Sequence, residues 1–107
     1  MRRLILRFIP AGLVCLAFIP ATQAQSDAAK IFKSNCVLCH SADGSGDSST
    51  GKALKAKDLR SADVQGQSDA ALAEAITKGK GKMPAFGKKL KPDDVSGLVT
   101  YVRGLKK

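Results

Sequence analysis

The chain has 107 residues and a formal net charge of +9, with 18 lysines and arginines against 9 acidic residues. This length allows one small domain. The basic balance suits nucleic acid, an anionic membrane or an acidic protein as partner, but the scarcity of aromatic residues and the lack of an arginine stripe argue against nucleic acid.

The first 24 residues are predicted to be a cleaved secretory signal peptide. They begin with three arginines, Arg2, Arg3 and Arg7. An apolar run over 8–19 follows, and the small residues at 20–24 suit cleavage after Ala24. The run is shorter than the roughly 20 residues of a membrane-spanning helix, which argues against the alternative of a retained anchor. Residues 25–107 then form the mature domain, with 15 basic against 9 acidic residues after the three arginines leave, about +6.

The mature domain is predicted to be helical, with no strand. A first helix is expected from about Asp27 to Cys39, with Ser26 or Asp27 as its N-cap. Residues 41–67 are rich in Gly, Ser, Asp and Lys, and we expect them to be largely irregular with one short helical turn near 52–57. So long an irregular stretch is reasonable in a compact domain if it wraps a large ligand.

Two further helices are expected in the second half. Ser68 is a good N-cap and Gly79 a good stop for a helix over Asp69 to Lys78. The last helix is predicted to begin at Pro92, whose fixed φ suits a first helical position. It carries apolar residues at helical spacing: Val95, Leu98, Val99 and Val102.

The segment Cys36-Val37-Leu38-Cys39-His40 is the centre of the functional prediction. Two thiols at this spacing can add to the two vinyl groups of one haem, and His40 is then placed to bind the iron. Three other uses compete. A disulfide is possible in an oxidising compartment, a thioredoxin-like pair needs a βαβ context, and zinc needs more ligands than the mature domain offers. The pattern favours covalent attachment of a c-type haem.

Met83 is the candidate for a second iron ligand, because it is the only methionine of the mature domain. It lies in the glycine-rich loop Gly79-Lys80-Gly81-Lys82-Met83-Pro84, which has little side-chain bulk and can approach a flat cofactor closely. Pro84 restricts the backbone of Met83 to extended conformations. The alternative is a methionine that fills a gap in the core. With the haem motif upstream, ligation is the favoured interpretation.

The order of helix, CxxCH, long loop, helix, GKMP-type loop and C-terminal helix resembles the small class I cytochromes c of bacteria, near the cytochrome c6 and c551/c552 group. The resemblance covers roughly residues 26–105. It implies an all-α fold with three main helices wrapped around one covalently bound haem c. It also implies attachment through Cys36 and Cys39, with His40 and Met83 as iron ligands.

The same resemblance implies that the first and last helices cross, near Phe32, Leu98 and Tyr101. The chain departs from many relatives at one point, because it has no Trp to bind a haem propionate from the middle loop. Basic residues of that loop are possible substitutes: Lys55, Lys57 and Arg60.

An iron bound by both His40 and Met83 has no open position for a substrate, and the methionine sulfur raises its reduction potential. We therefore expect a one-electron carrier, not an enzyme, that is soluble in the periplasm and shuttles electrons between redox proteins of a respiratory chain. Neither nucleic-acid binding nor stable membrane insertion after cleavage is expected. The alternatives are a haem enzyme in which Met83 is off the iron, and a tethered subunit of an oxidase or dehydrogenase.

Lysines are clustered around the candidate ligand Met83. They predict a docking face for redox partners with acidic surfaces, against the alternative of a merely solvated basic surface. The cluster consists of Lys78, Lys80, Lys82, Lys88, Lys89 and Lys91.

Overall fold

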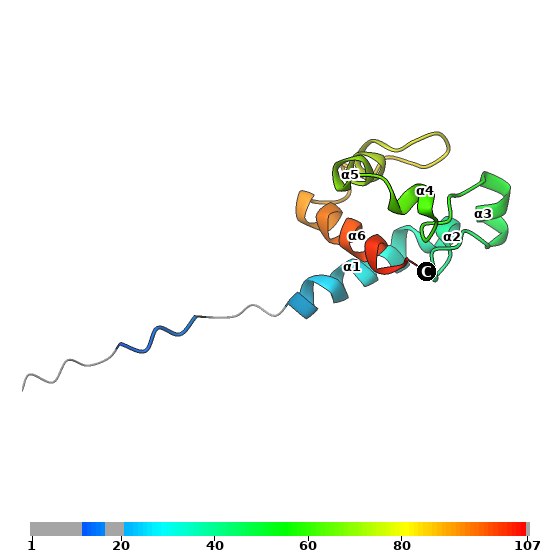
Figure 1. Cartoon of the computed structure of the whole chain (residues 1–107). Helices are drawn as coiled ribbons and strands as arrows, with labels where there is room; N and C mark the ends of the chain where they lie inside the picture. Colours follow the sequence, from blue (N-terminus) through cyan, green and yellow to red (C-terminus); the bar gives the residue numbers. More distant parts are fainter. Residues whose placement is uncertain (1–11, 17–20, 107) are drawn as a thin grey trace, which may run out of the picture.

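The computed structural model describes residues 12–16 and 21–106. Within these ranges it has six helices and no strand: α1 (Ala21–Asn35), α2 (Val37–His40), α3 (Ser49–Leu54), α4 (Ala62–Gln65), α5 (Asp69–Lys78) and α6 (Pro92–Gly104). The three longest are α1, α5 and α6, which agrees with the predicted all-α fold (Figure 1). The predicted signal peptide lies largely outside the described residues. No helix in the described part is both long and apolar enough to cross a membrane.

The first helix differs from its prediction at both ends. It begins at Ala21, so Ser26 and Asp27 lie inside it and the predicted N-cap is wrong. Alanine and glutamine dominate its first turns, and both propagate a helix well. The helix ends at Asn35, before a separate helical turn that carries the CxxCH motif. The predicted cleavage point after Ala24 falls within α1.

The middle stretch is more ordered than predicted, because serine side chains cap two short helices there. The Ser48 hydroxyl accepts a hydrogen bond from the Gly51 N–H at the start of α3, and Ser61 caps α4 through the N–H of Val64. The turn expected near 52–57 lies instead at Ser49–Leu54, and α4 was not predicted. Lys55 ends α3 in the left-handed region, with φ at 55°.

The second half of the chain folds as predicted. The Ser68 hydroxyl accepts the N–H of Ala71 and starts α5, which ends at Gly79 with φ at 73°. Pro92 is the first residue of α6. The four apolar residues predicted for its inner face are all buried: Val95, Leu98, Val99 and Val102.

The core lies on α6, against which both α1 and α5 pack (Figure 1). Phe32 of α1 and Leu98 of α6 are 2% and 1% exposed, and the rings of Phe32 and Tyr101 lie 4.8 Å apart between centroids. The predicted contact between the first and last helices is thus confirmed. A second cluster joins Val64 and Leu72 to Val99 and Val102 of α6.

Candidate haem site

The CxxCH motif forms one compact helical turn at the end of α1. Cys36 precedes the turn, and its carbonyl oxygen accepts hydrogen bonds from the N–H groups of Cys39 and His40, over 3.2 and 2.9 Å. The three side chains predicted to hold a haem therefore come from a single turn. Both cysteines carry free thiols in the structure. Burial, followed by the neighbouring Cys39, raises the pKa of the Cys36 thiol to about 11.

The imidazole of His40 is held by a backbone acceptor. Its Nδ1 atom lies 2.9 Å from the carbonyl oxygen of Lys57. Because a carbonyl oxygen can only accept, Nδ1 carries the ring proton, and the lone pair of the neutral ring is on Nε2. This is the tautomer in which a histidine binds a metal through Nε2 while its second-shell partner fixes the ring.

Helix α3 and its N-cap residue Ser48 contact backbone atoms of the CxxCH turn. The Ser48 hydroxyl donates to the carbonyl oxygen of Leu38 over 2.9 Å, while it caps α3. A Cβ at Gly51 would lie 2.1 Å from the carbonyl oxygen of Cys39, so only glycine allows this approach. The CxxCH turn and α3 are thereby packed backbone to backbone.

The segment that supplies the acceptor for His40 is itself braced by an ion pair. The Arg60 guanidinium contacts the Asp58 carboxylate at 3.1 and 3.3 Å, and Asp43 at 3.6 Å. These contacts, with Asp58 the main cause, raise the pKa of Arg60. Arg60 is therefore engaged with carboxylates of the chain, which weakens its candidacy as a propionate partner.

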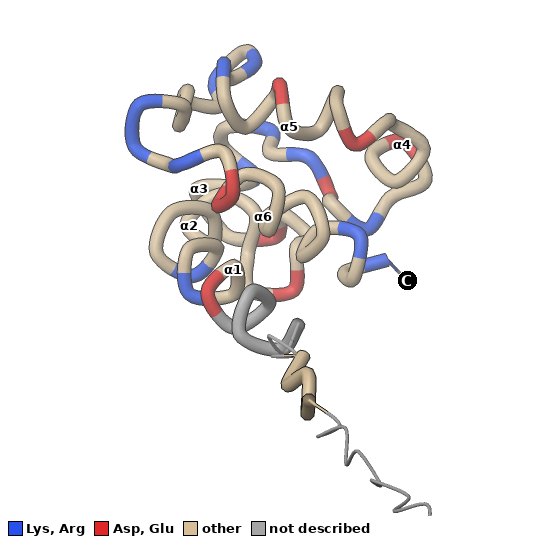
Figure 2. The backbone as a smooth tube through the Cα atoms, turned by 90° about the vertical axis from the view of Figure 1, so that its left-hand side faces the viewer, with Lys and Arg blue, Asp and Glu red and all other residues tan. Residues whose placement is uncertain are grey.

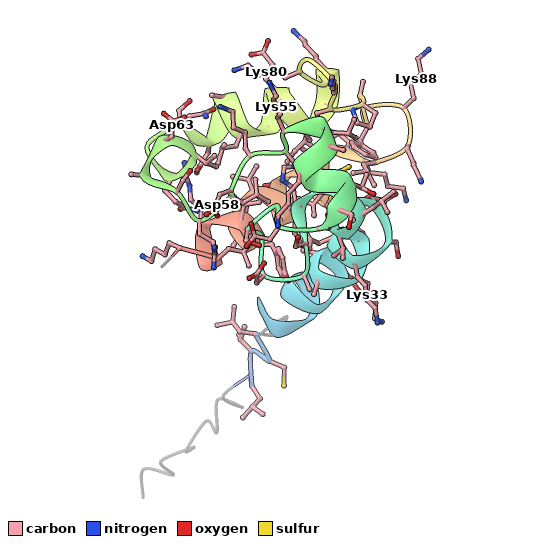
Figure 3. The ribbon with its side chains drawn as sticks, turned by 90° about the vertical axis from the view of Figure 1, so that its right-hand side faces the viewer. Lys33, Lys55, Asp58, Asp63, Lys80 and Lys88 are labelled. Carbon is pink, nitrogen blue, oxygen red and sulfur yellow. The ribbon has the colours of Figure 1, made fainter. Side chains whose placement is uncertain are left out.

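The other two candidates for that role have different surroundings. Lys57 lies 4.0 Å from Asp63, and both side chains are largely exposed. Lys55 is exposed at the end of α3 (Figure 3). Neither lysine is held in a buried pair, so both keep the freedom to reach an anionic group.

Met83 lies in the loop between α5 and α6 and is half-buried. Lys80 and Met83 exchange two backbone hydrogen bonds, of 3.1 and 3.0 Å, across a tight turn. The loop then returns to α5, where Phe86 N–H donates to Ile76 and Gly87 N–H to Thr77. Met83 and His40 thus come from different segments, and ligation by Met83 stays a prediction.

The predicted lysine cluster lies along the same loop and the adjoining ends of α5 and α6. Its members are exposed: Lys78, Lys80, Lys82, Lys88, Lys89 and Lys91. Figure 2 shows several of these basic positions on the loop that leaves α5. Lys78 also pairs with Glu74 at 3.3 Å along α5. The cluster is a solvated basic surface in the isolated chain.

Comparisons with known proteins identify the family. Residues 23–102 match the family described as "Cytochrome C oxidase, cbb3-type, subunit III". Cytochrome c6 of Nostoc sp. is 40% identical over 86 residues, which cover 79% of this chain and 75% of the relative. The solved c-type cytochrome KustC0563 has a TM-score of 0.70 at 36% identity, over 76% of this chain and 99% of its own. The chain is a small class I cytochrome c.

A third relative of this cytochrome c is much longer. The cbb3-type cytochrome c oxidase subunit FixP of Azorhizobium caulinodans is 35% identical over 85 residues. The match covers 78% of this chain but 28% of FixP. The similarity is thus confined to a part of that subunit.

Membership of this family implies a covalently bound haem c with its iron and one-electron transfer as the function. The residues present fit such a group. Two unbonded thiols stand beside a histidine whose hydrogen bond leaves Nε2 as the ligand atom. The motif spacing predicted these residues, but the sequence did not indicate the support that Ser48 and Gly51 give to the turn, nor the role of the Lys57 carbonyl as acceptor for His40.

Proposed function

We propose that this cytochrome c is an exported, soluble one-electron carrier of the periplasm that shuttles electrons between redox proteins of a respiratory chain. In this proposal Cys36 and Cys39 would hold the haem through thioether bonds, and His40 and Met83 would supply the ligands of its iron. Residues 1–24 serve as the signal peptide, and residues 25–107 are the mature carrier.

One observation carries the proposal. His40 belongs to the same helical turn as two free thiols, and its Nδ1 donates a hydrogen bond to the carbonyl oxygen of Lys57. The thiols supply two covalent links, and the bond orients the imidazole and raises its basicity as a ligand. When bound, the haem iron supplies reversible one-electron chemistry at a potential raised by a methionine ligand. Buried apolar residues pack between α1, α5 and α6, and rigid apolar surroundings would limit reorganisation when the charge of the site changes.

The test uses the chain produced with c-type maturation machinery. We expect an intact mass with one covalent haem, sharp visible bands on reduction, and a weak absorption band near the red edge of the oxidised spectrum from methionine ligation. Met83→Leu should abolish that weak band and lower the reduction potential while the haem stays attached. A wild-type protein that lacks the band and turns over peroxide would indicate an enzyme instead.

The lysines around Met83 extend the proposal to partners. Six exposed cations on and beside one loop favour brief, salt-sensitive encounters with acidic faces of other redox proteins.

A tethered oxidase subunit is the second candidate function, because the matching family is described as a subunit of a cbb3-type oxidase. In that case the N-terminal apolar run would remain as an anchor. N-terminal sequencing of the native protein separates the two: a start near Gln25 supports the free carrier, and a start at Met1 in the membrane fraction supports the subunit.

A further inference from the structure

The side chain of Gln65 joins two parts of the chain that are far apart in sequence. Gln65 is the last residue of α4 and is half-buried. Its Nε2 atom donates to the carbonyl oxygen of Leu59 over 2.8 Å and to that of Val102 over 2.9 Å. Both hydrogens of the amide nitrogen are therefore used, one toward the loop before α4 and one toward the end of α6.

Leu59 lies only two residues after Lys57, the residue whose carbonyl accepts from His40. The residues next to Lys57 are cross-linked, because the Asp58 carboxylate accepts hydrogen bonds from both the backbone N–H and the guanidinium of Arg60. The N–H of Leu59 also donates to Gly44 over 2.8 Å. A displacement of the Leu59 carbonyl would therefore be passed to the carbonyl of Lys57.

We propose that Gln65 is a positioning residue for the iron ligand. It ties Leu59 to the end of α6 and so keeps the Lys57 carbonyl on Nδ1 of His40. The inference rests on the proposed function, in which His40 binds iron. A firm acceptor on Nδ1 makes the imidazole a stronger donor, which favours the oxidised iron. Loss of the Gln65 amide should loosen that acceptor and raise the reduction potential.

The two hydrogen bonds of the Gln65 amide can be removed by substitution while other contacts still hold α4 in place. The Arg103 guanidinium donates to the backbone carbonyl of Gln65 over 2.7 Å and to the Asp69 carboxylate over 3.0 Å. Val64 is also buried in the cluster on α6. The bond of Arg103 to the Gln65 carbonyl and the burial of Val64 both remain when the Gln65 side chain is replaced. The variant therefore retains the support that keeps α4 in place.

The experiment compares wild-type, Gln65→Leu and Gln67→Leu as matured holoproteins. Gln67 is the matched control, because its amide makes one local contact, at 3.5 Å to Asp63. The readouts are the reduction potential and the rate at which the His40 Nδ1 proton exchanges with water, measured by NMR. For Gln65→Leu we expect a higher potential and exchange on the order of tenfold faster, which corresponds to about 1.4 kcal/mol. For Gln67→Leu we expect neither change.

Ser68→Ala is the control for a general loss of stability. It removes the N-cap of α5 at a similar cost in the free energy of unfolding and should leave both readouts unchanged. If Gln65→Leu does not mature, Gln65→Asn keeps an amide that is too short to reach both carbonyls and should shift both readouts the same way. Wild-type values of both readouts in a folded Gln65 variant would overturn the inference. Absence of histidine ligation in the wild-type protein would instead contradict the proposed function.

Discussion

The N–H of Gly87 donates to the carbonyl oxygen of Thr77 over 3.0 Å and so closes the Met83 loop onto the last turn of α5. A Cβ at Gly87 would lie 2.9 Å from that same oxygen and 2.8 Å from the Thr77 methyl carbon. The end of the loop is therefore fixed by a contact that no larger residue can make without a shift of the backbone.

Gly87→Ala should therefore displace the loop and weaken ligation by Met83. We expect the red-edge band of the oxidised protein to be reduced or lost and the reduction potential to fall, with the covalent haem retained. Visible spectroscopy and a redox titration measure both. Gly104→Ala is the control, because a Cβ there meets nothing within 4 Å. A band of wild-type strength in Gly87→Ala would refute this role of the loop closure.

Gly51→Ala should be among the most damaging substitutions in the chain. The added carbon would lie 2.1 Å from the Cys39 carbonyl oxygen and 2.5 Å from that of Gly46, both backbone atoms. Helix α3 must then move off the CxxCH turn, at a cost of roughly 3 kcal/mol or more. Chemical denaturation of the holoprotein measures the loss. Ser49→Ala, at an exposed position two residues earlier in α3, should lower the free energy of unfolding by less than about 0.5 kcal/mol.

Phe32→Ala tests the crossing of α1 and α6. Phe32 is 2% exposed and stacks at a tilt of 40° against Tyr101. Removal of the ring leaves a cavity between the helices, so we expect a loss of about 3–5 kcal/mol in the free energy of unfolding. Lys33→Ala, at the next and exposed position, serves as the control. A loss below about 1 kcal/mol would show that the crossing contributes little.

Charge reversal tests the docking role of the lysine cluster. Lys88→Glu with Lys89→Glu should slow the reaction of the reduced protein with the anionic oxidant hexacyanoferrate(III) on the order of tenfold at low ionic strength. The difference should shrink as salt is added. Lys30→Glu with Lys33→Glu changes the net charge equally but on α1, away from the loop. Equal effects of the two pairs would show that only the total charge matters.

The ionised carboxylate of Asp43 should stabilise the fold, and this contribution should be lost when the carboxylate is protonated at low pH. Hydrogen bonds from Ser45, chiefly from its side chain, lower the pKa of Asp43 below its usual value of 3.8. A carboxyl with a lowered folded-state pKa stabilises the fold above the unfolded value, and this contribution disappears as pH falls below about 4. Asp43→Asn should therefore be less stable than wild type at pH 5, with a gap that narrows toward pH 2. Thermal melts across that range measure it, and a constant gap would contradict the assignment.

Much of the fold could be predicted because its signals are local. Helices α5 and α6 each combine an N-terminal signal, Ser68 or Pro92, with apolar residues at helical spacing. Helices α3 and α4 have six and four residues, too few for a periodic pattern to emerge. Their capping serines were visible in the sequence. What holds α3 in place, however, is a bond from Ser48 to a carbonyl ten residues away.

The candidate site likewise contains some residues that sequence spacing indicates and others that only the fold brings together. Cys36, Cys39 and His40 could be predicted as haem-binding residues because their chemistry depends on sequence spacing. The Lys57 carbonyl could not be found, because every residue has a carbonyl and only the fold selects this one. Gln65 was missed for a related reason, since its two acceptors come together only when α4 meets α6.

The acceptor for His40 is a main-chain atom, and this has a consequence for how the protein can diverge. Any amino acid at position 57 retains that oxygen, so the hydrogen bond to His40 does not depend on which side chain stands there. Substitutions on the surface near position 57 can therefore accumulate as redox partners change, while the acceptor that orients the His40 imidazole is retained.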